Sequence, residues 1–114
     1  MEVTIYHNPR CSKSRQALSL LESKGNKPIV VEYLKNPLTT EQLSQIINEL
    51  NIKPIDLVRK NESIWKENYK GKELSDDELV EAMISNPKLI ERPIVTSSKG
   101  TVVGRPPENV LRVL

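Results

Sequence analysis

A strand pattern, a helix pattern and a second strand pattern follow one another at the start of the chain, and this order constrains the fold more than any other feature. Val3 to Tyr6 is a short apolar run, and Ser12 to Lys24 carries apolar residues at helical spacing before Gly25. Pro28 to Leu34 is rich in β-branched residues and is expected to form the second strand. Two strands joined by a helix pair in parallel, so this segment predicts a βαβ unit.

Two helix-start patterns mark the middle of the chain. Thr39 with Gln42, and Ser75 with Glu78, form capping boxes, and apolar residues at amphipathic spacing follow each of them. A short helix is expected between them at Pro54 to Val58, and the polar stretch after it shows no clear pattern. The middle of the chain is therefore expected to be helical.

The last quarter of the chain predicts a hairpin and a closing helix. Ile94 to Thr96 and Thr101 to Val103 flank a short turn sequence, which is typical of a β-hairpin. Pro106 and Pro107 suit the start of a helix. The expected apolar face of that helix is formed by Val110, Leu111 and Leu114.

These elements fit one domain. The chain has 114 residues, enough for a single core, and 37% hydrophobic residues without any Phe predict an aliphatic core. We expect an α/β domain over residues 1–114, with a four-stranded mixed sheet and a helical insertion at about residues 39–88 between the second and third strands. The order of elements resembles the thioredoxin-like fold.

Charge and apolar patterning limit the classes of function. Seventeen Lys and Arg against fifteen Asp and Glu give a net charge of +2, which is too balanced to indicate nucleic-acid binding. No apolar run approaches the roughly eighteen residues of a membrane-spanning helix, and no export signal is visible. With a single cysteine and hence no internal disulfide, the sequence predicts a soluble, cytoplasmic protein that binds neither nucleic acid nor membrane.

That single cysteine, Cys11, lies between the first strand and the first helix. A thiol attacks as the thiolate, whose pKa is lowered by a helix N-terminus or by nearby cations. The helix start supplies free N–H groups, and Arg10, Lys13 and Arg15 supply positive charge. The alternative is a buried structural cysteine. The polar, cationic neighbours favour a nucleophile.

His7 and Ser14 flank Cys11 and are candidates for tuning its thiolate. His7 could hydrogen-bond into the loop or lend partial positive charge to the thiolate. Ser14, one turn inside the helix, could donate a hydrogen bond to the sulfur of Cys11. For Ser14 the alternative is an ordinary solvated serine. We expect no metal site, because a structural zinc ion takes four ligands and the chain offers one Cys and one His.

Four motifs follow one another along the chain: His7-Asn8-Pro9-Arg10-Cys11-Ser12-Lys13-Ser14, Leu57-Val58-Arg59-Lys60-Asn61, Glu91-Arg92-Pro93-Ile94-Val95 and Gly104-Arg105-Pro106-Pro107-Glu108. In this order they resemble the ArsC family, the arsenate reductases coupled to glutathione and glutaredoxin. The resemblance covers roughly residues 3 to 113 and extends to the related Spx-like regulators.

The resemblance implies that Cys11 attacks arsenate and that three arginines, Arg59, Arg92 and Arg105, hold the oxyanion. Arginine suits this role because its planar guanidinium donates paired hydrogen bonds and keeps its proton. The same cations would also stabilise a Cys11 thiolate before substrate arrives. The alternative for each arginine is a solvated surface residue. The resemblance also implies that Pro93, just before the third strand, follows a cis peptide bond.

The resemblance further implies glutathione as co-substrate, glutaredoxin as protein partner and no bound cofactor, and we expect a monomer. The absence of a second cysteine agrees with an external reductant. Two other functions remain open: a general glutathione-dependent thiol oxidoreductase, and a non-enzymatic, Spx-like adaptor that binds RNA polymerase. Ser14 stands where many Spx-like proteins have the second cysteine of a redox pair, which disfavours a disulfide switch.

Overall fold

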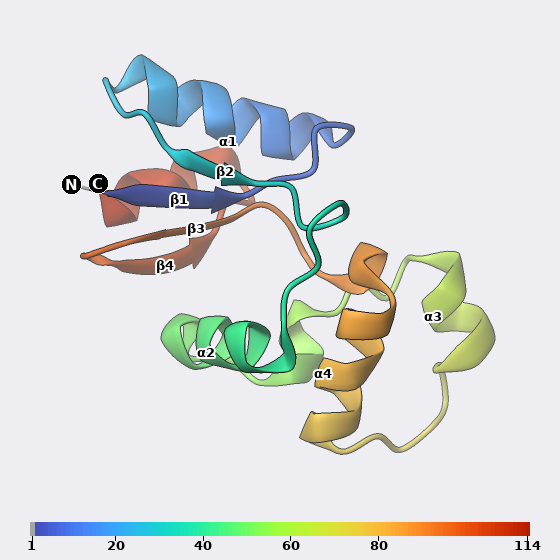
Figure 1. The fold of residues 1–114 in the computed structure, drawn as a ribbon. Helices are drawn as coiled ribbons and strands as arrows, with labels where there is room; N and C mark the ends of the chain where they lie inside the picture. The colour runs from blue at the N-terminus through green and yellow to red at the C-terminus, as the bar shows by residue number, and fades with distance from the viewer. Residues whose placement is uncertain (1) are drawn as a thin grey trace. The chain divides into compact units, whose positions relative to one another are not determined.

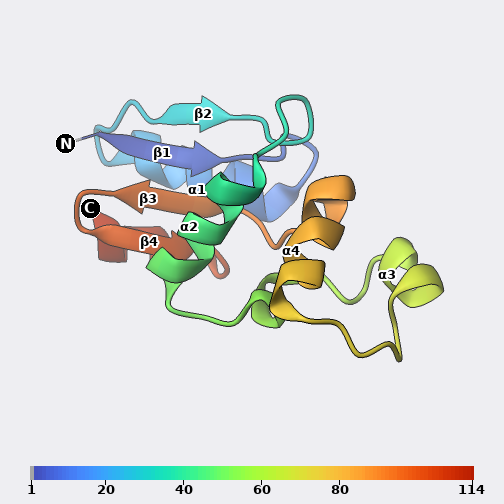
Figure 2. The ribbon, with the colours of Figure 1, turned by 60° about the horizontal axis from the view of Figure 1, so that its bottom comes forward.

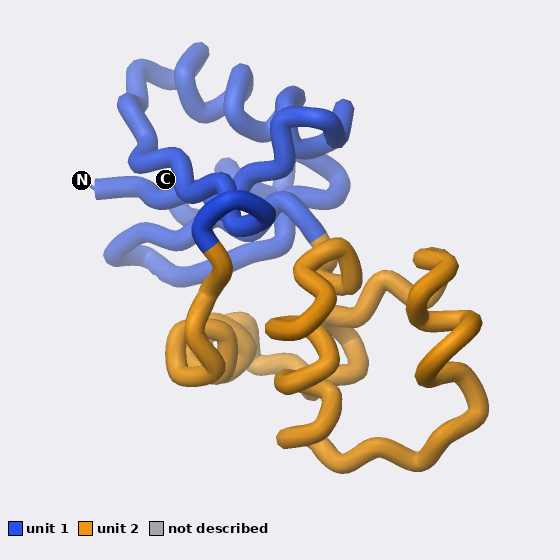
Figure 3. Tube along the Cα trace, turned by 45° about the vertical axis from the view of Figure 1, so that its right-hand side comes forward, with its two compact units in different colours: residues 1–36, 92–114 blue, residues 37–91 orange. Residues whose placement is uncertain are grey.

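The computed structural model describes residues 2–114 and divides the chain into two compact units (Figure 3). Unit 1 comprises Met1–Asn36 and Arg92–Leu114, and unit 2 comprises Pro37–Glu91. The helical insertion expected at about residues 39–88 falls within unit 2. The single-domain assignment stays a prediction.

Unit 1 contains a mixed sheet of four strands (Figures 1 and 2). The strands are β1 (Val3–Tyr6), β2 (Ile29–Val31), β3 (Ile94–Ser97) and β4 (Gly100–Val103), in the order β2-β1-β3-β4. β1 pairs in parallel with β2 and antiparallel with β3, and β3 pairs antiparallel with β4. The predicted βαβ unit, the hairpin and the four-stranded mixed sheet are confirmed.

Two helices pack with this sheet. They are α1 (Ser12–Ser23) and the 3₁₀ helix η3 (Pro107–Val113), which contact each other, and η3 also contacts β4. Their buried side chains form one aliphatic core with those of β1 and β3, as expected for a chain without Phe. Its members are Val3, Ile5, Ala17, Leu21, Val95, Val110 and Val113.

β2 is shorter than its sequence predicted. A strand was expected over Pro28 to Leu34, but pairing is confined to Ile29–Val31. The carbonyl oxygen of Glu32 accepts the backbone N–H groups of both Lys35 and Asn36 at 2.9 Å, so the chain turns directly after the strand. The β-branched run ends at this turn, and the hydrogen-bonded pairing of β2 with β1 ends there too.

The closing helix buries a different face from the predicted one. A 3₁₀ helix has three residues per turn, so residues spaced by three share a face. The buried residues of η3 have this spacing: Pro107, Val110 and Val113. Leu111, expected in the apolar face, is 42% exposed. The prediction assumed α-helical spacing, and that assumption was wrong.

Unit 2 is helical. Its α-helices are α2 (Thr40–Leu50), α3 (Ser63–Asn68) and α4 (Asp76–Ser85), and its 3₁₀ helices are η1 (Pro54–Leu57) and η2 (Pro87–Leu89). α4 contacts α2, η1 and η2. Among residues 2–114, no helix is long and apolar enough to cross a membrane.

Both predicted capping boxes are present in unit 2. The Thr39 hydroxyl accepts the Gln42 backbone N–H at 3.1 Å, and Ser75 accepts that of Glu78 at 3.2 Å. In each case the side chain three residues on accepts the N-cap backbone N–H in return. α3, in contrast, lies in the polar stretch that showed no pattern, and it is anchored by the buried side chain of Trp65.

Candidate active site

A tight turn carries the chain from β1 into α1. The carbonyl oxygen of Asn8 accepts the backbone N–H of Cys11 at 3.0 Å, and its side-chain Oδ1 accepts the backbone N–H of Arg10 at 3.0 Å. Asn at the first position and Pro9 at the second are residues that favour such a turn. The turn ends at Cys11, directly before the helix.

Cys11 is the N-cap residue of α1, with extended backbone (φ −94°, ψ 122°) and a partly exposed side chain. Burial by itself raises the pKa of this thiol. The backbone N–H of Ser14, the Arg92 guanidinium and the backbone N–H of Lys13 outweigh burial, so the pKa of Cys11 is lower than its usual value. Helix-start amides and a cation thus both favour the thiolate.

The cation belongs to the arginine trio rather than to the residues next to Cys11. Arg10, Lys13 and Arg15 were expected to supply positive charge beside the sulfur. Lys13 acts through its backbone N–H, and Arg15 donates from Nη1 to the carbonyl oxygen of Pro9 at 2.9 Å. The guanidinium that lowers the pKa of Cys11 belongs to Arg92, which is separated from β3 by Pro93.

Ser14 is fully buried, so the alternative of a solvated serine is wrong. Its Oγ lies 2.6 Å from Nδ1 of His7 and accepts the backbone N–H of Asn8 at 3.1 Å. The hydroxyl therefore joins the turn to the helix. Ser14 reaches the sulfur of Cys11 through its backbone N–H.

His7 is also buried. Burial lowers its pKa, the Glu32 carboxylate opposes this, and the Arg15 charge adds to the lowering; the net shift is downward. The shift favours neutral imidazole, whose Nδ1 lies within hydrogen-bond distance of the Ser14 hydroxyl.

The peptide bond between Arg92 and Pro93 is cis, as the resemblance implied. Gly104 donates its backbone N–H to the carbonyl oxygen of Pro93 at 2.8 Å. A Cβ atom at Gly104 would lie 2.9 Å from Cγ of Pro93, closer than real Cβ atoms approach, and 3.1 Å from Cγ1 of Val110, a tight contact. Only glycine lets these two segments approach.

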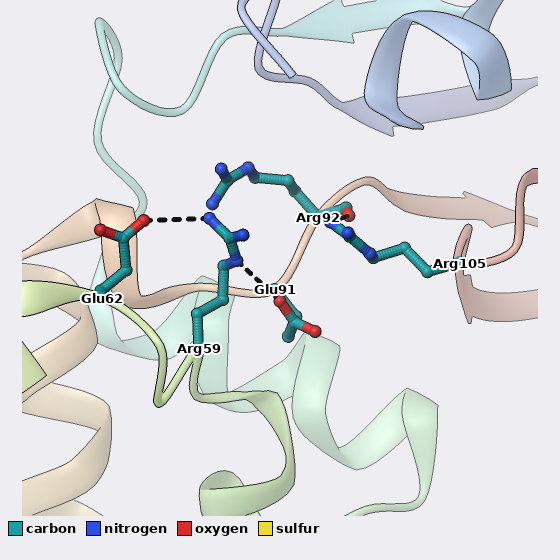
Figure 4. A network of polar contacts seen from close by, with 5 residues as sticks. All are labelled: Arg59, Glu62, Glu91, Arg92 and Arg105. Atoms are coloured by element: carbon teal, nitrogen blue, oxygen red, sulfur yellow. Dashed lines mark hydrogen bonds and ion pairs between the residues drawn. The ribbon is translucent and has the colours of Figure 1, made fainter. Parts of the chain in front are cut away.

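Arg105 follows that glycine, and its peptide bond to Pro106 is also cis. Its Nη1 donates to the backbone carbonyl oxygen of Arg92 at 3.4 Å (Figure 4). Unit 1 therefore brings Arg92 to the sulfur of Cys11 and links Arg105 to Arg92.

Arg59 lies in unit 2, where two carboxylates hold it. Its Nη1 donates to Oε1 of Glu62 at 3.0 Å, and its Nε lies 2.9 Å from Oε1 of Glu91 (Figure 4). Its side chain is 20% exposed, so the alternative of a solvated surface arginine does not describe it.

Comparison with known proteins places this geometry in a family. Residues 6–113 match the model of the ArsC family. The chain belongs to the ArsC family. It is 42% identical over 116 residues to the arsenate reductase of Haemophilus influenzae, covering 100% of both chains. It is 44% identical over 115 residues to the Escherichia coli (strain K12) protein named "Uncharacterized protein YfgD", covering 99% of this chain and 97% of that one.

A solved structure supports the same placement. The structure of an arsenate reductase from Vibrio cholerae superposes with a TM-score of 0.95 at 46% sequence identity, covering 100% of this chain and 98% of that chain. The α/β architecture is therefore that of ArsC structures, and the predicted thioredoxin-like fold is confirmed.

Three further residues of this ArsC family chain contribute to the candidate site. Asn8 shapes the turn before Cys11, and Glu62 and Glu91 hold Arg59. The Asn-Pro pair and the spacing of three between Arg59 and Glu62 are visible in the sequence; the partner from remote Glu91 is not. Within residues 2–114, no cluster of three or more His, Cys, Asp or Glu side chains is arranged to hold a metal ion.

Proposed function

We propose that this protein reduces arsenate to arsenite through the thiolate of Cys11, with glutathione and glutaredoxin as the source of electrons. The observation that carries the proposal is the action of Arg92 on Cys11, which lowers the pKa of the thiol at a helix start. Full-length relatives with 42 to 46% identity that are called arsenate reductases add support.

In this proposal Arg92 has two roles. Before substrate binds, its positive charge stabilises the thiolate. When arsenate arrives, the same guanidinium donates hydrogen bonds to the oxyanion, together with those of Arg105 and Arg59. The support for Arg105 is its hydrogen bond to Arg92, and the support for Arg59 is its family motif.

The chemistry balances with two thiols per arsenate. The Cys11 thiolate attacks As(V), an As–S bond forms, and one arsenate oxygen leaves as hydroxide or water. A glutathione thiol then attacks this adduct. Arsenic takes up two electrons and leaves as arsenite, while the two sulfur atoms are oxidised to a disulfide between Cys11 and glutathione.

The enzyme is regenerated from outside the chain. Glutaredoxin, itself reduced by glutathione, attacks the mixed disulfide and returns Cys11 as a thiol, by ordinary thiol–disulfide exchange. An internal resolving cysteine is absent from the sequence, and Ser14 occupies the place three residues after Cys11 where one would stand.

The test is steady-state production of arsenite by the purified protein with arsenate, glutathione and glutaredoxin. We expect turnover that saturates with arsenate and is lost in Cys11→Ser. Reduction of mixed disulfides without saturable arsenate turnover would instead identify a general thiol oxidoreductase. Absence of any turnover, with RNA polymerase binding that survives Cys11→Ser, would identify a Spx-like adaptor.

A further inference from the structure

We infer that Glu62 and Glu91 are positioning residues for oxyanion binding, because together they fix the guanidinium of Arg59 in unit 2. This inference rests on the proposed function, which gives Arg59 an oxyanion to bind. Neither carboxylate belongs to the cysteine, the arginine trio or the turn around the thiol.

The backbone brings Arg59 and Glu91 together. The backbone N–H of Arg59 donates to the carbonyl oxygen of Leu89 at 2.7 Å. The backbone N–H of Glu91 donates to the carbonyl oxygen of Leu57 at 2.8 Å. Between these hydrogen bonds, Val58 and Ile90 form an isolated antiparallel bridge, and both are buried. Two segments remote in sequence are thus locked in register, with Arg59 and Glu91 on either side of the bridge.

A second piece of fixed backbone carries Glu62. Its backbone N–H donates to the carbonyl oxygen of Arg59 at 3.2 Å, which closes a turn. Glu62 is also the N-cap residue of α3, and its carbonyl oxygen accepts the backbone N–H of buried Trp65 at 3.1 Å. Backbone hydrogen bonds therefore fix the main chain of Glu62 and Glu91 independently of the ion pairs that their carboxylates make.

The ion pairs divide the guanidinium between them. Nε faces Glu91 at 2.9 Å, and Nη1 faces Glu62 at 3.0 Å. Arginine carries five N–H donors, so these contacts leave both donors of Nη2 and one of Nη1 for another acceptor.

Two opposing effects of the carboxylates on anion binding can be weighed. They repel an oxyanion, but the exposed fractions of 28% for Glu62 and 31% for Glu91 leave them partly screened by solvent. They also hold the long side chain of Arg59, which would otherwise become ordered only when the oxyanion binds. The entropy cost of that ordering weakens the affinity for the oxyanion. Because both pairs have short, separate contacts on one guanidinium, we expect positioning to outweigh repulsion.

The experiment compares arsenate kinetics of the full chain, wild type and variants, with saturating glutathione and glutaredoxin. We expect the double variant Glu62→Ala with Glu91→Ala to lower kcat/KM about tenfold, mainly through a higher KM for arsenate. Each single alanine variant keeps one ion pair and is expected to lose about threefold. The corresponding glutamine variants keep a hydrogen-bond acceptor and should retain most of the activity.

Two controls separate positioning from general effects. Glu67→Gln removes one negative charge from an exposed position in α3 and should leave KM unchanged. In an Arg59→Ala background, the Glu62 and Glu91 substitutions should have no further effect on KM, because no guanidinium is left to position. A merely structural role for the carboxylates would persist in that background.

The outcomes are distinct. A higher kcat/KM in the alanine and glutamine variants would show that the carboxylates only repel the anion, and unchanged kinetics would show that they do nothing; either overturns the inference. If the double variant does not fold, the single variants and their Arg59→Ala combinations decide. If the wild type makes no arsenite, the proposed function itself has failed, and unchanged kinetics in Arg59→Ala alone would remove Arg59 from its role.

Discussion

Arg92 in unit 1 and Arg59 in unit 2 are held in opposite ways. Arg92 acts on a sulfur and lowers the pKa of Cys11, while its buried Nε has no hydrogen-bond partner within residues 2–114. Arg59 is bound by two carboxylates, at Nε and at Nη1. One unit uses a cation to stabilise an anion, and the other uses anions to hold a cation.

This difference indicates two separate contributions to one reaction. Because the Arg92 guanidinium favours the thiolate of Cys11, Arg92 should control reactivity and its pH dependence. A guanidinium neutralised by carboxylates adds little net charge but is fixed in direction, so Arg59 should control substrate affinity. Loss of Arg92 should therefore change the thiol pKa as well as arsenate binding, whereas loss of Arg59 should change arsenate binding alone.

Cys11→Ser should have the largest effect. Because serine cannot form the As–S bond or the later mixed disulfide, arsenate reduction should fall by at least about a thousandfold. The measurement is arsenite production with glutathione and glutaredoxin, and thermal unfolding of the variant serves as the control for folding. A variant that keeps a substantial rate would show that unit 1 does not supply the nucleophile.

Arg92→Ala should come next. Loss of the guanidinium raises the pKa of Cys11, so less thiolate is present at neutral pH, and the rate of alkylation by iodoacetamide should fall about tenfold there and recover at alkaline pH. Arg105→Ala is the matched control: it should weaken arsenate binding without moving the alkylation profile. Equal shifts of that profile in both variants would contradict the separate role of Arg92.

Ser14→Ala should act mainly on stability. It leaves the backbone N–H of Asn8 and the ring of His7 without their buried partner, which should lower the free energy of unfolding by about 1–3 kcal/mol. The thiol pKa should change little, since Ser14 reaches Cys11 through its backbone N–H. Ser19→Ala, at an exposed position of the same helix, is the control.

For Ser14→Ala, urea unfolding and the pH dependence of alkylation are the two measurements. A thiol pKa raised as far as in Arg92→Ala, with unchanged stability, would show that the hydroxyl acts on the sulfur directly.

The smallest expected effect concerns His7. Its pKa is lower in the folded protein, mainly because of burial, so folding favours the neutral ring. The stability that His7 contributes is therefore complete above the pKa of an unfolded histidine and is lost as pH falls through the lower pKa of the folded state. His7→Asn should flatten this part of the pH dependence in urea unfolding. An identical slope in the variant would assign the dependence to other groups.

Local patterns in the sequence predicted the local structure well. Both capping boxes, Thr39 with Gln42 and Ser75 with Glu78, start helices as expected, because their hydrogen bonds join residues three apart. The same local reasoning failed for the closing helix, where sequence spacing did not distinguish a 3₁₀ from an α-helical face.

The candidate site was harder to predict where its contacts are remote. Of the cations expected to stabilise the Cys11 thiolate, Arg92 of the arginine trio lowers its pKa, and the family resemblance rather than the local sequence pointed to it; the pairing of β1 with β3 brings it near. Glu91 lies near Arg59 because of an isolated β-bridge, which no periodic pattern in the sequence predicts. Buried Ser14 did leave a signal, since it precedes Ala17 by three residues and Leu21 by seven, on one helical stripe.

The most direct test of the account is a single-turnover experiment without glutaredoxin. Protein, arsenate and glutathione are mixed, arsenite is counted, and the chain is analysed by mass spectrometry. We expect a burst of about one arsenite per chain and one glutathione attached through a disulfide at Cys11. Arsenite formed without that adduct, or the adduct formed equally without arsenate, would contradict it.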